Sequence, residues 1–159
     1  MNALAQRLGE RLKARRAVLV TAESCTGGWA AQAVTAIAGS SGWFERGFVT
    51  YSNAAKEEML SVRHETLARH GAVSEETARE MALGALERSR GTIALAITGV
   101  AGPAGGSAAK PVGTVCFAWA IKGAAQSAET RHFSGDRDAV RRQSVEHALA
   151  RALELLDAG

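Results

Sequence analysis

The sequence has few cysteines and no long apolar run. Its two cysteines, Cys25 and Cys116, match no metal-ligand spacing. No apolar segment approaches the roughly 18–20 residues that a membrane span needs. The first segment, MNALAQRLGERLKARRAVLV, ends in an apolar stretch that is too short for the core of a signal peptide. We therefore expect a cytoplasmic protein with no disulfide and no membrane partner.

The net charge is small and aromatic residues are few. The net charge is +3, the lysines and arginines are scattered, and there are three tryptophans, four phenylalanines and one tyrosine. This composition does not favour a nucleic-acid partner, although a basic DNA-binding module remains a weak alternative. None of the four histidines belongs to an HExxH motif. We therefore expect no bound metal, no cofactor and no histidine-based catalytic triad.

Apolar runs alternate with amphipathic segments along the chain. Leu4, Leu8 and Leu12 recur at helical spacing and predict a first amphipathic helix. Asn53, Ser74 and Asp136 are suited to open later helices. The expected strands are residues 17–21, 47–52, 92–97, 111–121 and 129–133, and the other expected helices are residues 26–38, 53–62, 64–70, 75–88 and 136–156.

This order predicts a single three-layer α/β/α domain, residues 1–159, with a mixed, mostly parallel sheet. The last two strands are separated only by a turn near Gly123, so we expect them to pair antiparallel. The sequence contains no linker, repeat or low-complexity segment. Because 47% of the residues are hydrophobic, the chain can build a sizeable core.

Residues 21–28, TAESCTGG, concentrate reactive side chains where the first strand meets a helix. A hydroxyl there can attack a carbonyl while free N–H groups of Thr26, Gly27 and Gly28 bind the developing oxyanion. Glycine suits close backbone approach because it has no Cβ. The structural alternative, with about even odds from the pattern alone, is that Ser24 or Thr26 simply caps the helix.

Lys56 lies in the first turn of the helix expected after TYSN. The positive end of the helix dipole destabilises a charged lysine there, and burial would destabilise it further. A lysine that loses its proton easily can act as a base toward a hydroxyl. A solvated lysine beside Glu57 or Glu58 is the structural alternative. Tyr51 could orient the lysine or relay a proton, or it could be an ordinary strand aromatic.

The Gly-rich segment TGVAGPAGGSAAKPVGT follows the strand at residues 92–97. Its spacing matches neither a dinucleotide-binding motif nor a P-loop, but its exposed N–H groups could bind a phosphate or a carboxylate. Ser107 and Lys110 also match the SxxK string of penicillin-recognising enzymes. That chemistry requires both residues on one helical turn, and glycines before and Pro111 after make a helix a poor prediction here.

Five separated segments together resemble the CinA C-terminal domain family, whose stand-alone members are nicotinamide-nucleotide amidohydrolases. The resemblance covers residues 5–155, and the segments are TAESCTGGW, GSSGWFERGFVTYSNAAK, HGAVSEETAREMA, AITGVAGPAGGSAAKPVGTV and GDRDAVRRQ. It implies hydrolysis of the carboxamide of nicotinamide mononucleotide (NMN) to nicotinic acid mononucleotide and ammonia. This reaction recycles NMN into the pyridine nucleotide pool.

The resemblance also implies a serine nucleophile helped by a lysine, without an essential metal. By motif, these residues are Ser24 and Lys56, with Tyr51 as a third catalytic residue. The Gly-rich segment is implied to receive the nucleotide, and its candidate substrate-binding residues are Thr98, Gly99, Gly102, Gly105, Gly106, Ser107 and Lys110. A small-molecule substrate and a homo-oligomer are expected.

Two alternatives remain. Cys25 could be the nucleophile, because a thiol at a helix N-terminus can have a lowered pKa. The protein could instead be a non-catalytic nucleotide-binding module, or one associated with competence or DNA repair as the family name hints. Arg137, Arg141 and Arg142 in GDRDAVRRQ are interpreted as a solvated helix face, although they could reach an acidic ligand.

Overall fold

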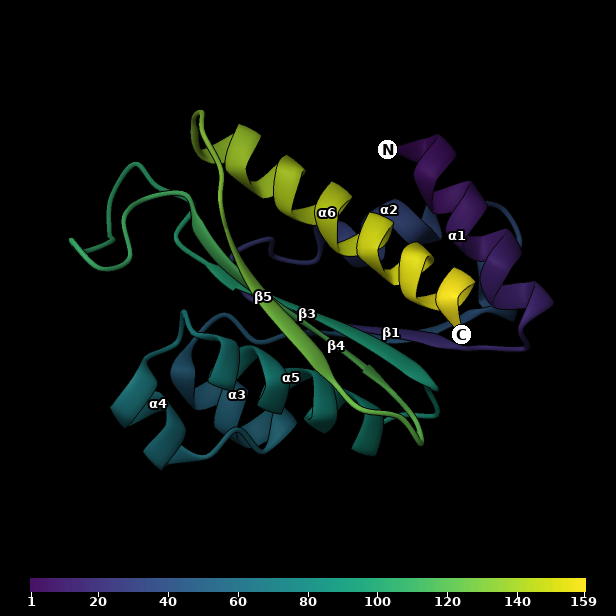
Figure 1. Ribbon diagram of the computed structural model, residues 1–159, viewed down its shortest axis with the longest axis horizontal. Helices are drawn as coiled ribbons and strands as arrows, with labels where there is room; N and C mark the ends of the chain where they lie inside the picture. Colours follow the sequence, from purple (N-terminus) through teal and green to yellow (C-terminus); the bar gives the residue numbers. More distant parts are fainter.

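The computed structural model describes all 159 residues and contains one five-stranded sheet between two layers of helices (Figure 1). The strands are β1 (Leu19–Glu23), β2 (Phe44–Val49), β3 (Ile93–Gly99), β4 (Thr114–Ile121) and β5 (Ser127–His132). The helices are α1 (Asn2–Ala14), α2 (Trp29–Thr35), α3 (Asn53–Leu60), α4 (His64–His70), α5 (Glu75–Glu87) and α6 (Arg137–Ala158), with a short 3₁₀ helix at Ser40–Gly42. No helix is long and apolar enough to cross a bilayer.

The strand order is β2-β1-β3-β4-β5. Strands β2, β1 and β3 pair in parallel, whereas β4 pairs antiparallel with both β3 and β5. Strand β4 alone therefore runs against the other four. The prediction of a mixed sheet in an α/β/α fold is confirmed, as is the antiparallel pairing of the last two strands.

The two faces of the sheet carry different side chains. Helices α1, α2 and α6 cover one face, and α3, α4 and α5 cover the other (Figure 1). Along β3, Ile93, Leu95 and Ile97 pack into the first layer, whereas Ala94 and Ala96 pack toward α5. Because both faces are buried, the strand reads as a continuous apolar run instead of an alternating one.

The segment between β1 and α2 differs from the prediction in its boundaries. Strand β1 continues through Glu23, so Ser24 follows directly on the strand. The helix begins at Trp29 instead of Thr26, because Gly27 (φ 60°) and Gly28 (φ 104°) hold left-handed conformations that a helix cannot include. A turn of irregular backbone therefore separates the serine from the helix.

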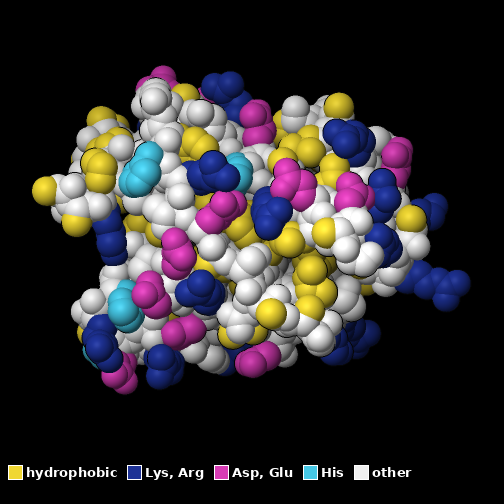
Figure 2. All heavy atoms as spheres, viewed as in Figure 1, with side chains coloured by type: hydrophobic (Ala, Val, Ile, Leu, Met, Phe, Trp, Pro, Cys, Tyr) yellow, Lys and Arg dark blue, Asp and Glu magenta, His cyan; other side chains and the backbone are white.

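Charged side chains are interspersed over the face shown in Figure 2, where basic and acidic groups lie next to one another and several histidines lie among them. Ion pairs on the helices include Arg79 with Glu75 and Arg69 with Glu65. Exposed pairs of this kind contribute little stability. This face shows no large area of a single sign.

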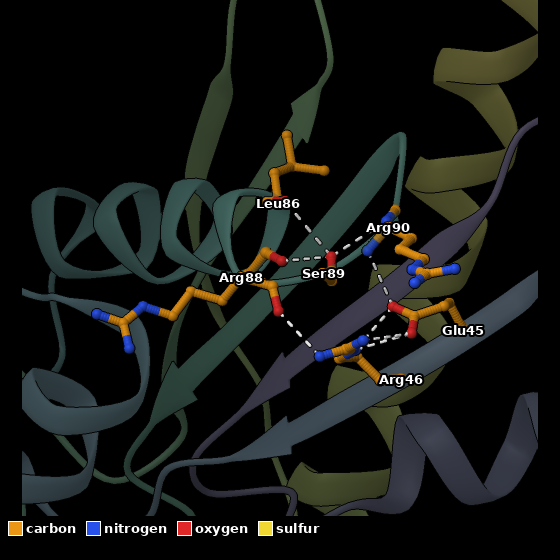
Figure 3. A network of polar contacts seen from close by, with 8 residues as sticks. Glu45, Arg46, Leu86, Arg88, Ser89 and Arg90 are labelled. Carbon is orange, nitrogen blue, oxygen red and sulfur yellow. Dashed lines mark hydrogen bonds and ion pairs between the residues drawn. The ribbon is translucent and has the colours of Figure 1, made fainter.

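One polar network joins the edge strand β2 to the segment after α5 (Figure 3). Glu45 pairs with Arg46, the carboxylate accepts from the Arg90 N–H at 3.0 Å, and Arg46 Nη1 donates to the Arg88 carbonyl at 3.0 Å. The network lies at the amino end of β2. The opposite end of the sheet, where β1, β2 and β3 all terminate, is free to carry functional groups.

Candidate active site

Ser24 lies at the carboxyl end of β1, beside the segment that follows β2. Its N–H donates to the Ile97 carbonyl of β3 at 2.9 Å, which continues the sheet pairing by one residue. Its Oγ lies 3.4 Å from the Tyr51 carbonyl and 2.9 Å from Lys56 Nζ. The sheet therefore fixes the backbone of the serine, and the next crossover brings a lysine to its hydroxyl.

Lys56 reaches Ser24 from the first turn of α3. Ser52, instead of Asn53, caps this helix by accepting from the Ala55 N–H at 3.0 Å, so Lys56 is the fourth helical residue. Its side chain points into the protein and is only 1% exposed. The alternative of a solvated lysine beside Glu57 or Glu58 is therefore wrong.

Lys56 Nζ has three oxygen partners and no carboxylate. It lies 2.9 Å from Ser24 Oγ, 2.9 Å from the Thr50 carbonyl and 3.4 Å from the Tyr51 carbonyl. An ammonium can donate to all three oxygens. A neutral amine can donate to the two carbonyls and direct its lone pair at the serine hydroxyl. The same geometry therefore accommodates both protonation states, as a group that takes up and returns a proton requires.

Burial sets the protonation of this lysine. Removal of the ammonium from water lowers the pKa of Lys56 to about 8, and only a weak contribution from Cys25 opposes this shift. At pH 7 about a tenth of Lys56 is therefore neutral, far more than for an ordinary lysine with a pKa of about 10.4. A neutral amine at hydrogen-bond distance from Ser24 Oγ is a suitable general base for that hydroxyl.

Cys25 is placed differently from Ser24, although the two are neighbours. Its side chain packs into the core beneath the turn and is 7% exposed. Burial raises the pKa of the Cys25 thiol to about 12, so the thiolate is scarce at neutral pH. Because the thiolate is the nucleophilic form of cysteine, this environment favours Ser24 over Cys25.

The backbone N–H groups of the turn after Ser24 differ in whether they donate a hydrogen bond within the protein. The Gly27 N–H donates to the Ser24 carbonyl at 3.0 Å and is already engaged. The N–H groups of Cys25, Thr26 and Gly28 donate no hydrogen bond within the protein. Thr26 is fully buried, whereas Gly28 is partly exposed. Of the three predicted oxyanion donors, Gly28 is thus unpaired and accessible, and the Cys25 N–H is an additional unpaired donor.

A buried carboxylate caps α2 in place of the residues that the sequence suggested. Glu23 accepts from the N–H groups of Ala30 at 2.8 Å and Ala31 at 3.1 Å, and from Thr26 Oγ1 at 2.6 Å. The capping alternative for Ser24 or Thr26 is therefore wrong. Because Glu23 satisfies the helix N-terminus, Ser24 Oγ is not used as a cap.

The Tyr51 side chain points away from the lysine. It is 64% exposed, and its hydroxyl accepts from Arg137 Nη2 at 3.3 Å. The contact of Tyr51 with Lys56 and Ser24 is through its backbone carbonyl. The structure therefore shows Tyr51 helping to orient the lysine by its main chain, and shows no contact through which its hydroxyl would relay a proton to Lys56.

Arg141 is not part of a solvated helix face, which corrects the interpretation of GDRDAVRRQ for this residue: it is partly buried and donates to the carbonyls of Cys25 and Thr26, both at 3.1 Å. Arg137 and Arg142 are exposed as expected, but Arg137 Nη1 also donates to the Gly102 carbonyl at 2.8 Å. Single-sequence periodicity missed these contacts because their partners are far away along the chain.

The Gly-rich segment contacts the site residues through Gly102. Gly102 contacts Arg137, which in turn contacts Tyr51. Beside it lies a cavity of about 470 Å³, lined by Ala101, Pro103, Val112, Gly135, Asp136, Arg137 and Asp138. Arg137 lines this cavity and also contacts the Tyr51 hydroxyl, so it connects the cavity to the Tyr51 side chain.

The other predicted substrate-binding residues have structural partners or are exposed. Thr98 is buried and donates to the Ala72 carbonyl at 2.7 Å, and Lys110 Nζ donates to the His70 carbonyl at 2.6 Å. Ser107 Oγ accepts from the Lys110 N–H in a turn, not a helix, so the SxxK match is coincidental. Gly99 ends β3 with no room for a Cβ, and Gly105 and Gly106 are exposed.

No group of three or more His, Cys, Asp and Glu side chains is arranged to hold a metal ion. The histidines have other partners: His147 lies 2.6 Å from a Glu129 oxygen, and His132 Nδ1 lies 3.2 Å from Thr114 Oγ1. None of them contacts Ser24 or Lys56. The two side chains in contact at this candidate site are the hydroxyl of Ser24 and the amine of Lys56.

The chain is similar to known proteins over most of its length. The family model of the CinA C-terminal domain matches residues 1–156. Nicotinamide-nucleotide amidohydrolase PncC of Escherichia coli K12 is 60% identical over 146 residues, 92% of this chain and 88% of that protein. The enzyme of the same name from Pseudomonas putida is 52% identical over 155 residues, 98% of this chain and 96% of that protein.

A solved structure agrees with the fold. The crystal structure of a CinA superfamily protein from Klebsiella pneumoniae 700603 superposes with a TM-score of 0.96 at 44% identity, covering 99% of this chain and 98% of that one. Sequence and structure agree over nearly the whole length, so the resemblance drawn from five short segments is confirmed. The chain belongs to the CinA C-terminal domain family.

Proposed function

We propose that this protein hydrolyses the carboxamide of nicotinamide mononucleotide to nicotinic acid mononucleotide and ammonia, with Ser24 as the nucleophile and Lys56 as the base. The observation that carries the proposal is the 2.9 Å contact between Ser24 Oγ and the buried Lys56 Nζ. The names of the relatives, at up to 60% identity, supply the substrate. Recycling of NMN in the cytoplasm is the corresponding physiological role.

The first half of the reaction forms an acyl-enzyme. Neutral Lys56 takes the proton of the Ser24 hydroxyl as Oγ bonds to the carbonyl carbon of the amide. The negative charge moves to the carbonyl oxygen, which the unpaired N–H groups of Cys25 and Gly28 can bind. The Lys56 ammonium then protonates the amide nitrogen, the C–N bond breaks, and ammonia leaves.

The second half reverses the roles of the pair. A water molecule attacks the ester carbon while Lys56 accepts its proton. The bond to Ser24 Oγ breaks, Lys56 returns a proton to that oxygen, and the carboxylic acid product leaves. The three oxygen partners of Nζ keep the lysine in place in both protonation states, so each transfer requires little rearrangement.

The remainder of the nucleotide calls for a positive group away from the amide. Arg137 contacts both the Tyr51 hydroxyl and the Gly102 carbonyl, beside the cavity of about 470 Å³. A guanidinium is well suited to bind phosphate oxygens. We therefore assign the phosphate to the side of the site formed by Arg137 and the Gly102 end of the Gly-rich segment.

A comparison of substrates tests the function. Ammonia release is measured with NMN, nicotinamide riboside and nicotinamide at equal concentrations. We expect turnover of NMN and a loss of at least tenfold in kcat/KM without the phosphate, since one charge-assisted contact contributes about 1.5–3 kcal/mol. Equal turnover of all three would contradict the phosphate assignment, and no ammonia from any of them would contradict the function.

A non-catalytic nucleotide-binding module is the alternative function, because the same pocket could bind NMN without turnover. Calorimetric binding of NMN with no ammonia formed would favour it. A DNA-binding version predicts affinity that falls steeply with salt. The interspersed charges of the face in Figure 2 do not favour that version.

A further inference from the structure

Arg141 joins α6 to the turn that carries the nucleophile. Its Nε donates to the Cys25 carbonyl at 3.1 Å and its Nη2 to the Thr26 carbonyl at 3.1 Å. The guanidinium carbon lies 5.4 Å from the centre of the Trp29 ring, at the start of α2. No carboxylate pairs with it. One planar cation therefore serves to hold two successive carbonyls, with an aromatic ring as its support.

These contacts set the directions of the free donors. In a trans peptide the C=O and N–H point in opposite directions. Arg141 and the Trp29 N–H, the latter at 3.0 Å, both donate to the Thr26 carbonyl, and the N–H of that same peptide, on Gly27, donates to the Ser24 carbonyl at 3.0 Å. That bond in turn orients the Ser24–Cys25 peptide, whose N–H is unpaired. Three consecutive peptide planes are thereby fixed.

We propose that Arg141 is a positioning residue for the reaction: it holds the turn after Ser24 in the one shape that presents the Cys25 N–H to the oxyanion. This inference rests on the proposed function of Ser24. The amide directly after a nucleophile is the donor that hydrolases with a strand–turn–helix nucleophile use for this purpose. Arg141 acts through the backbone and touches no reacting atom.

Three variants separate two effects of Arg141: the planar guanidinium that reaches two carbonyls, and the positive charge. Arg141→Met keeps much of the side-chain length without donors, and Arg141→Lys keeps the charge but not the fork that reaches two carbonyls. Arg142→Met, one residue along and exposed, is the matched control. We expect both Arg141 variants to lower kcat for ammonia release about 100-fold, near the loss of one oxyanion donor, with KM changed less than about threefold. The control should match the wild type.

Further readouts distinguish positioning from general support of the fold. We expect added guanidinium at millimolar concentration to restore part of the kcat of Arg141→Ala, while the unfolding temperatures of the Arg141→Met and Arg142→Met proteins stay close. Wild-type kcat in Arg141→Lys would overturn the proposal, because charge alone would then suffice. A raised KM at unchanged kcat would also overturn it, since Arg141 would then bind the substrate.

Labelling by a fluorophosphonate makes the test independent of NMN. Lys56 would take the proton of Ser24 as Oγ bonds to phosphorus and displaces fluoride, with negative charge growing on the phosphoryl oxygen as it does on a carbonyl oxygen. We expect this labelling, followed by mass spectrometry of the Ser24 peptide, to slow at least tenfold in Arg141→Met and not in Arg142→Met. A wild-type protein that is labelled but does not release ammonia from NMN would contradict the proposed substrate alone. Equal labelling of all variants would contradict the role of Arg141.

Discussion

At the residue scale, the chemistry depends on one amine that is kept partly neutral. Lys56 is buried beneath the first turn of α3 with only oxygen acceptors around it, and its pKa falls to about 8. Loss of water, not a neighbouring cation, is the main cause. The base is therefore produced by burial, and its protonation should appear directly in the pH dependence of the enzyme.

We expect kcat/KM for NMN to rise with pH along a limb whose apparent pKa is near 8. Below this value Lys56 is an ammonium and cannot accept the serine proton, and above it the amine is neutral. Lys56→Arg, which stays protonated at every accessible pH, should lose about 10²–10⁴-fold in rate without regaining it at high pH. A limb near 10 would contradict the lowering of the Lys56 pKa by burial, and a limb retained in Lys56→Arg would assign the ionisation to another group.

The sequence predicted Ser24 and Lys56 but not their supporting residues. The patterns singled out both residues as candidates but left a capping role open for Ser24 and a solvated role open for Lys56, and the resemblance to the family decided for the pair. Glu23 lay beyond the end of the expected strand at residues 17–21 and was given no role, and its contacts with the N–H groups of Ala30 and Ala31 depend on where the helix begins. The carbonyls that Arg141 contacts belong to residues 115–116 positions earlier in the sequence, so no local pattern predicts these contacts.

At the element scale, the packing of α5 against α3 controls where the lysine lies. Gly84 of α5 faces the end of α3, and a Cβ on Gly84 would lie 1.9 Å from the Leu60 carbonyl oxygen. Leu60 is on the same helix as Lys56. The two helices therefore touch through backbone, and any added side-chain atom must push α3 away from its position.

We expect Gly84→Ala to lower the free energy of unfolding by about 1–3 kcal/mol and to lower kcat, because α3 and Lys56 must shift together. Gly42→Ala is the control, since a Cβ there would meet nothing within 4 Å. Urea denaturation and ammonia release from NMN measure the two effects. A Gly84→Ala protein as stable and as active as Gly42→Ala would show that this contact does not position the lysine.

Element types were more predictable from the sequence than their ends. The helix caps at Ser74 and Asp136 are confirmed, because capping is a local interaction of a side chain with N–H groups three residues on. The start of α2 was wrong by three residues. The helix begins later because Gly27 and Gly28 adopt left-handed conformations. Glycine can adopt several backbone conformations, so the sequence alone does not predict which one occurs.

At the scale of the whole molecule, the sheet is shared by both layers. The side chains of β3 alternate between a core beneath α1, α2 and α6 and a core beneath α3, α4 and α5. The order of the strands was not predictable from the sequence, because it depends on which distant segments pair. The presence of a layered mixed sheet was predictable from the alternation of strands and helices.

Because the strands belong to both cores, we expect residues 1–159 to unfold as one cooperative unit. Met81→Ala on the α5 side and Leu149→Ala on the α6 side remove fully buried side chains. Each should lower the free energy of unfolding by about 2–5 kcal/mol and shift one and the same calorimetric transition. Two transitions, of which each variant shifts only one, would contradict a single domain.

The central claim is that Ser24, and not its neighbour Cys25, attacks the amide. The most direct measurement is ammonia release from NMN by Ser24→Ala and Cys25→Ala, with circular dichroism to show that both variants remain folded. The account predicts that Ser24→Ala loses turnover by about 10⁴-fold or more, while Cys25→Ala keeps activity close to that of the wild type. Near wild-type turnover in Ser24→Ala, or its loss in a folded Cys25→Ala, would contradict it.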